Sequence, residues 1–201
     1  MKTEAVIFDL GNVFIDVDHA RALLRLRSHG AGSASLIGDT AVAERLIHSF
    51  ERGELSTPQF YEVVCRHAEL PIDLERFCAI YCDIFSPVPE MIEAHAALRS
   101  RGFPTYIFSN TSELHFSHIR DRYRFMSEFT GYFLSYELGS MKPDASAYDA
   151  VEKGTGHRGS ELLYIDDRPE NVEAGAARGW NTIHHTDARL TVASLRKMAL
   201  L

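Results

Sequence analysis

Three apolar stretches of the chain each end on side chains that bind cations or anions. These side chains are Asp9 after the first stretch, Ser109 and Asn110 after the second, and Asp166 and Asp167 after the third. Carboxylates gathered at one place repel one another unless a cation is present, and hard oxygen ligands of this kind suit Mg²⁺. If the stretches are parallel strands, their carboxyl ends meet at one edge of a sheet, and the sequence predicts a Mg²⁺ site there.

A positive charge and anion-binding groups complete the pattern. Lys142 stands just ahead of a helix that we expect to begin after Pro143. A lysine, a hydroxyl and backbone N–H groups bind phosphate, and Asp9 is a candidate carboxylate nucleophile. Each residue alone has a commoner explanation, as a turn, a surface lysine or a helix cap. Their recurrence after successive strands favours a phosphate site.

Five short segments are expected to form the sheet that positions these residues. The apolar runs among them have the length and composition of strands buried on both faces. They alternate with helical patterns, which predicts an α/β fold with a doubly wound, Rossmann-like parallel sheet and right-handed crossovers. The expected strands cover residues 5–8, 104–108, 132–135, 162–165 and 182–183.

The stretch from Asp16 to about Ser86 shows helical patterns and no strand signal. Pro58 stands there at the start of a helix, behind a cap residue, Ser56. A run of small residues, 30–35, follows the first helix. We therefore expect a small α-helical cap, residues 17–87, inserted into a core domain of residues 1–16 and 88–201.

Composition narrows the range of functions. The chain has 201 residues, of which 45% are hydrophobic and 24% charged, and its formal net charge is −7. A negative charge disfavours nucleic-acid binding, which needs clustered Lys and Arg. No apolar run approaches a membrane span, and residues 1–4 lead directly into a strand, so we expect a cytoplasmic protein without membrane contact. Three cysteines in apolar helical patterns are interpreted as structural thiols: Cys65, Cys78 and Cys82.

The order of these motifs resembles that of the haloacid dehalogenase (HAD) superfamily of phosphohydrolases, over nearly the whole chain. Four motifs carry the resemblance: Phe8-Asp9-Leu10-Gly11, Ser109-Asn110-Thr111, Lys142-Pro143, and Ile165-Asp166-Asp167 with Asn171. Finer features, among them Glu51-Arg52-Gly53-Glu54, are similar to a bacterial subgroup that includes an α-D-glucose-1-phosphate phosphatase.

The resemblance implies a Mg²⁺-dependent phosphatase of small phosphate monoesters, with sugar phosphates as the expected substrates. Asp9 would attack phosphorus and form a phosphoaspartate that water hydrolyses. Lys142 would neutralise charge beside Asp9, and Ser109 and Asn110 would bind the substrate together with Lys142. The Mg²⁺ ligands would be Asp9, the backbone carbonyl of Gly11, Asp166 and Asp167. A monomer or weak homodimer is expected.

Gly11 departs from the pattern of the superfamily. Most of its phosphatases carry a second Asp at this position, which protonates the leaving oxygen and then activates water. The resembling subgroup shares the Gly, so hydrolysis stays expected. Asp16, Asp18 and His19 are candidates to replace the missing group, although the start of the first cap helix is the simpler explanation for them.

Two other functions stay open at this point. A metal-independent 2-haloacid dehalogenase also uses an Asp nucleophile and lacks the second Asp. A catalytically weak phosphate-ligand-binding protein would keep the pocket and lose turnover.

Several further polar residues have no assigned role. His115 and His118, one helical turn apart, are interpreted as helix residues or substrate contacts rather than a metal pair. Four residues are candidates to face the crevice between cap and core: Arg21, Glu51, Arg52 and Arg168.

Overall fold

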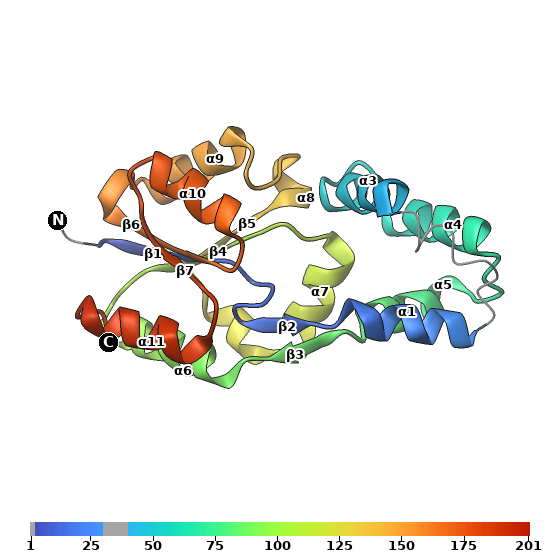
Figure 1. Cartoon of the computed structure of the whole chain (residues 1–201), viewed down its shortest axis with the longest axis horizontal. Coiled ribbons are helices and arrows are strands. Elements are labelled where there is room, and N and C mark those ends of the chain that lie inside the picture. The colour runs from blue at the N-terminus through green and yellow to red at the C-terminus, as the bar shows by residue number, and fades with distance from the viewer. Residues whose placement is uncertain (1–2, 30–39) are drawn as a thin grey trace.

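Five parallel strands form the sheet of the core: β1 (Ala5–Phe8), β4 (Thr105–Ser109), β5 (Gly131–Leu134), β6 (Leu162–Asp166) and β7 (Asn181–His184). The structure, a computed structural model, describes residues 3–29 and 40–201. The strand order is β5-β4-β1-β6-β7 (Figure 1), so the chain winds outward from β1 in both directions. The predicted doubly wound parallel sheet is therefore confirmed, each strand lying within one or two residues of its expected position.

Helices cover both faces of this sheet (Figure 1). One face is covered by α9 (Ala145–Thr155) and α10 (Pro169–Ala177), and the other by α6 (Pro89–Ser100) and α11 (Ala188–Lys197). Pro89 and Pro169 stand at the first position of their helices, where a missing N–H costs nothing. The remaining elements of the core are α7 (Glu113–Arg122), η1 (Arg124–Glu128), α8 (Ser135–Leu138) and η2 (Gly159–Glu161).

Side chains of β1 alternate between two apolar clusters. Val6 and Phe8 belong to the cluster on the α6 and α11 side, whereas Ala5 and Ile7 belong to the cluster that includes Tyr148 of α9. All four strand residues are fully buried. A strand buried on both faces holds its carboxyl end in a fixed place, and that end carries Asp9.

A separate group of helices follows the start of the chain: α1 (His19–Ser28), α3 (Thr40–Glu51), α4 (Thr57–Ala68) and α5 (Leu74–Cys82). We call residues 19–82 the helical segment; the predicted run of small residues, 30–35, lies outside the described residues. These helices pack around their own apolar cluster, in which the rings of Phe50 and Phe60 stack at 4.2 Å. Side-chain caps begin two of the helices, since Asp18 accepts from Arg21 N and Asp73 from Arg76 N.

A two-stranded antiparallel ribbon connects the helical segment to the core, and here the sequence prediction was wrong. The ribbon consists of β2 (Ile15–Val17) and β3 (Phe85–Pro87), with Ile15 paired to Pro87. No strand was expected between Asp16 and Ser86. Three residues carry too little periodicity to identify a strand, and the pairing joins segments far apart in the chain. The cap boundaries at residues 17 and 87 stay a prediction.

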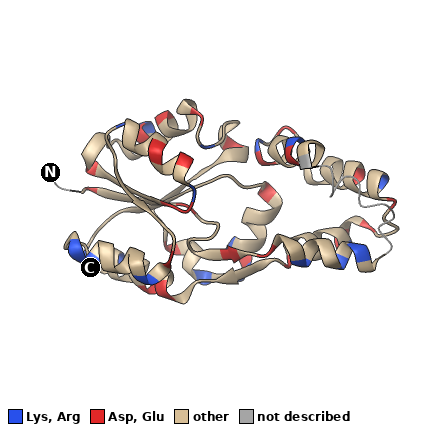
Figure 2. Ribbon diagram, viewed as in Figure 1, with Lys and Arg blue, Asp and Glu red and all other residues tan. Residues whose placement is uncertain are grey.

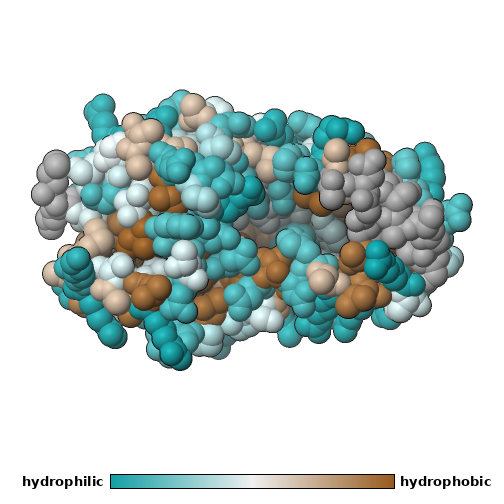
Figure 3. Space-filling view, in the orientation of Figure 1, coloured by the Kyte–Doolittle hydropathy of each residue, from teal (hydrophilic) through white to brown (hydrophobic). Residues whose placement is uncertain are grey.

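Acidic and basic residues are interspersed over the core and the helical segment (Figure 2). The surface is hollowed between these two parts (Figure 3). Of the helices in the described ranges, none is both long and apolar enough to cross a membrane.

Candidate active site

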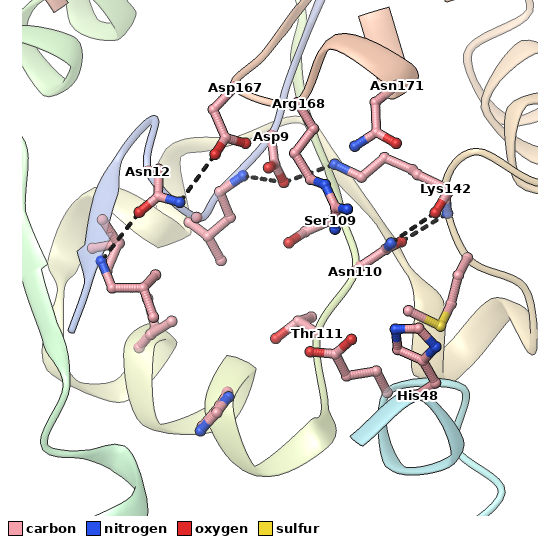
Figure 4. A pocket seen from close by; sticks show the side chains of 18 of the residues that line it. Asp9, Asn12, His48, Ser109, Asn110, Thr111, Lys142, Asp167, Arg168 and Asn171 are labelled. Atoms are coloured by element: carbon pink, nitrogen blue, oxygen red, sulfur yellow. Dashed lines mark hydrogen bonds and ion pairs between the residues drawn. The ribbon is translucent and has the colours of Figure 1, made fainter. Parts of the chain in front are cut away.

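The two oxygens of the Asp9 carboxylate have different surroundings. Oδ1 accepts from the backbone N–H of Leu10 at 2.7 Å and lies 2.8 Å from Lys142 Nζ (Figure 4). Oδ2 accepts no hydrogen bond from any residue in the described part of the chain. Burial raises the pKa of the Asp9 carboxyl to about 7, with Lys142 opposing the rise and Asp166 adding to it. One oxygen is thus anchored, and the other is free to act as a nucleophile.

Lys142 is buried and holds three oxygen atoms. Its Nζ donates to the carbonyl of Phe108 at 2.8 Å and to Asp166 Oδ2 at 2.7 Å, in addition to its contact with Asp9. Burial alone would lower the pKa of Lys142, but Asp9 and Asp166 more than offset this effect and hold it above its usual value. The ammonium group therefore stays charged between two carboxylates.

Asn110 positions the backbone of Lys142. Its Nδ2 donates to the Lys142 carbonyl at 2.9 Å and its Oδ1 accepts from the Lys142 N–H at 2.8 Å (Figure 4). The amide is thus engaged with the protein, and a role for Asn110 in binding substrate stays a prediction. Ser109 lines the cavity and makes no side-chain hydrogen bond within the described residues, so its hydroxyl can bind an anion.

Three carboxylates come together at the predicted edge of the sheet. Asp9, Asp166 and Asp167 each offer an oxygen within 4.8 Å of the others, and the described residues contain no other such group of potential metal ligands. Hard carboxylate oxygens at this spacing fit Mg²⁺. These three carboxylates are therefore the candidate ligands for a cation.

The two adjacent carboxylates differ in how many lone pairs they have left. Asp166 is fully buried and accepts from Lys142, Tyr164, Asn171 and the N–H of Arg168. Asp167 accepts only from Asn12 Nδ2, at 3.0 Å, among the described residues (Figure 4). Asp167 thus has more capacity for a cation, and Asp166 is largely occupied in holding Lys142 in place.

A cavity of about 370 Å³ opens over these groups and extends to the helical segment. Its walls include Asp9, Gly11, Lys142 and Asp167 from the core, and residues of α3 from the other side. The α3 residues are His48, Glu51 and Arg52. A ligand bound beside the carboxylates would therefore also contact the helical segment.

Some of the polar residues expected at the crevice between cap and core line the cavity, and others do not. Glu51, Arg52 and Arg168 line it, whereas Arg21 does not and instead pairs with Asp83 at 3.3 Å. His115 also lines it, but its ring stacks on Tyr81 at 4.5 Å and burial lowers its pKa to about 3. Among the described residues, neither His115 nor His118 belongs to a group of three or more potential metal ligands.

Sequence reasoning missed two residues that support the site. Asn12 holds Asp167 from a left-handed backbone conformation, φ 52°, which Asn tolerates better than most residues. Ser135 contacts both the core and α3, because its hydroxyl accepts from Thr111 N at 2.9 Å and lies 2.6 Å from the Glu51 carbonyl. The Gly11-Asn12 pair was a usable turn signal, whereas nothing local to Ser135 indicates its contacts.

The chain belongs to the haloacid dehalogenase-like hydrolase family, whose model matches residues 3–179. Its resemblance to this superfamily and its assignment as a hydrolase are thereby confirmed.

Individual relatives have named activities and a solved structure. The chain is 26% identical over 200 residues to sesquiterpene phosphatase astK of Aspergillus oryzae, covering 97% of this chain and 96% of the relative. It is 25% identical over 185 residues to a D-ribitol-5-phosphate phosphatase of Bacteroides thetaiotaomicron, covering 88% and 89%. A crystal structure of a HAD family enzyme from the same bacterium, in complex with magnesium and inorganic phosphate, superimposes with a TM-score of 0.79. That similarity covers 90% of this chain and 93% of the other at 21% identity, and shows a shared fold.

Proposed function

We propose that the protein is a Mg²⁺-dependent phosphatase that hydrolyses small phosphate monoesters through a phosphoaspartate on Asp9. The observation that carries this proposal is the Asp9 carboxylate, with one oxygen anchored by Leu10 and Lys142 and the other free at the cavity. The names of the two phosphatase relatives support the same chemistry.

Each residue of the site has a part in the proposed reaction. The free oxygen of Asp9 would attack phosphorus, while the Ser109 hydroxyl would bind a phosphoryl oxygen and the Lys142 ammonium group would neutralise charge beside Asp9. Asp9, Asp167 and the Gly11 carbonyl would hold Mg²⁺, with Asp166 completing the acidic group. Bound Mg²⁺ would reduce the repulsion between an anionic nucleophile and an anionic ester.

The substrate class is proposed as sugar phosphates and related polyol phosphates. Three observations support it: the cavity is small, its walls include polar side chains such as His48 and Arg168, and a relative acts on ribitol 5-phosphate. Closure of the helical segment, acting as a cap, would exclude water during the attack by Asp9.

Phosphate release from a panel of phosphate esters tests the proposal. Glucose 1-phosphate and ribitol 5-phosphate would be assayed with Mg²⁺ or with EDTA, using the wild type and Asp9→Asn. We expect release that requires both Mg²⁺ and Asp9. No release above the Asp9→Asn background on any ester would reject the proposal, and halide release from 2-haloacids and Mg²⁺-dependent phosphate binding would then test the two other functions.

A further inference from the structure

A phosphatase of this kind needs a proton donor for the leaving oxygen, and Gly11 provides none. The cavity walls hold four carboxylates: Asp9, Glu51, Asp144 and Asp167. Asp9 contacts Lys142, Asp144 pairs with Arg52, and Asp167 accepts from Asn12. Within residues 3–29 and 40–201, the side chain of Glu51 makes no hydrogen bond or ion pair, so its carboxyl group is free for a ligand.

The fold fixes the backbone of Glu51 against the core. The Ser135 hydroxyl lies 2.6 Å from the Glu51 carbonyl and also accepts from the N–H of Thr111, two residues after Ser109. The next residue, Arg52, pairs with Asp144 of the core at 3.0 Å. Glu51 is thus tied, through Ser135, to the loop that directly follows Ser109.

The surroundings of Glu51 suit proton transfer in both directions. Burial raises the pKa of its carboxyl to about 7, against the opposing effects of Arg168 and Lys142. Other titratable or charged groups beside it are Tyr81 of α5 and its own neighbours His48 and Arg52. A carboxyl group with a pKa near the working pH can donate a proton in one step and accept one in the next.

The histidines of the cavity are less suited to this task. His115 stacks on Tyr81 and directs Nε2 to the Tyr81 carbonyl at 3.3 Å, so its ring is already engaged. His19 and His48 are exposed to solvent, whereas Glu51 is partly buried.

We infer that Glu51 is the general acid and base of this site, in the place of the carboxylate missing at Gly11. The inference rests on the proposed phosphatase function. In the first step a bond forms from Asp9 to phosphorus, the bond from phosphorus to the ester oxygen breaks, and the Glu51 proton passes to that oxygen. In the second step water attacks phosphorus, the bond to Asp9 breaks, and the proton of water passes to Glu51. The helical segment thereby supplies a catalytic residue as well as a cover.

The test compares Glu51→Gln with Glu54→Gln, an exposed carboxylate three residues further along that does not line the cavity. Two substrates are used: an alkyl ester such as ribitol 5-phosphate, whose leaving oxygen needs a proton, and 4-nitrophenyl phosphate, whose leaving group does not. For Glu51→Gln we expect kcat on the alkyl ester to fall by about 10²- to 10⁴-fold. On the aryl ester we expect a stoichiometric burst of nitrophenol followed by slow turnover, because the phosphoaspartate forms but hydrolyses slowly. Glu54→Gln is expected to behave as wild type on both.

Two results would overturn the assignment of Glu51. One is a Glu51→Gln variant with kcat on the alkyl ester within threefold of wild type. The other is an equal loss on both esters without a burst, which indicates a structural effect. In either case, a wild type whose phosphate release requires Asp9 would leave the proposed function standing. An inactive wild type would overturn both.

Discussion

At the scale of single residues, we infer that Glu51 takes the place of the carboxylate that is missing at Gly11. Asp9, Lys142 and Asp167 reach the cavity from strand ends and loops of the core, whereas Glu51 arrives from α3. A phosphoryl-transfer site needs each group to be in place at the same moment. The position of α3 therefore matters for chemistry as well as for binding.

Gly11 offers a direct way to examine this replacement. A Cβ built there meets only Val17 Cγ2, at 3.6 Å, which is an ordinary contact. We expect Gly11→Asp, added to Glu51→Gln, to raise kcat on the alkyl ester at least tenfold above that of Glu51→Gln alone. The reason is that the new side chain supplies a carboxyl group in place of the one removed. Steady-state kinetics of the double variant measures this. Gly11→Asn in the same background is the matched control, and equal rates for the Asp and Asn variants would contradict the explanation.

At the scale of elements, the turn after α3 lies directly against the core. Gly53 has φ +74°, and a Cβ there would lie 2.4 Å from the carbonyl oxygen of Tyr136. Only a residue without a side chain permits this contact.

Gly53→Ala should therefore push the turn away from the core. We expect kcat/KM for the preferred ester to fall by at least tenfold, because the shift moves Glu51 and Arg52 from the cavity. Gly156→Ala is the control: Gly156 has the same φ of +74° and no atom within 4 Å of its Cβ, so it measures the backbone cost alone. Similar kinetics for the two variants would show that the contact with Tyr136 does not position the site.

Elements also show what sequence alone could predict. The five core strands were predictable because buried runs such as Ala5–Phe8 carry their signal locally. The meeting of Asp9 and Asp167 was predictable because strand ends of a parallel sheet meet at one edge. Lys142 lies in a loop between two helices, and its contact with Asp9 became visible only in the folded chain. The β2–β3 ribbon and the contacts of Ser135 were not, because each depends on partners brought together only by folding.

At the scale of the whole molecule, stability should depend on pH through buried neutral histidines. His95 is fully buried, contacts Thr105 Oγ1 at 2.9 Å, and stacks on Phe129 at 4.0 Å. Burial lowers its pKa from 6.5 to about 4, with Arg99 adding to the effect. Its contribution to stability is therefore complete above pH 6.5 and is lost as the pH falls toward 4.

We expect protonation of His95 to lower the free energy of unfolding by about 2 kcal/mol as the pH falls from 7 to 5. Urea denaturation at the two pH values would measure the loss in wild type and in His95→Leu. The variant should be less stable at pH 7 but should lose about 2 kcal/mol less on acidification. His67→Gln, at an exposed position of α4, is the control. Its free energy of unfolding should fall between pH 7 and pH 5 by as much as that of the wild type. An identical loss in wild type and His95→Leu would exclude His95 as the cause.

The ribbon of β2 and β3 has a consequence for how such proteins diversify. The chain leaves the core through Ile15–Val17 and returns through Phe85–Pro87, so the two ends of the intervening stretch are hydrogen-bonded neighbours. A stretch with paired ends can be lengthened, shortened or exchanged between lineages without changing the register of the central sheet. The residues that α3 contributes to the cavity could then change while the carboxylates at the sheet edge stay in place.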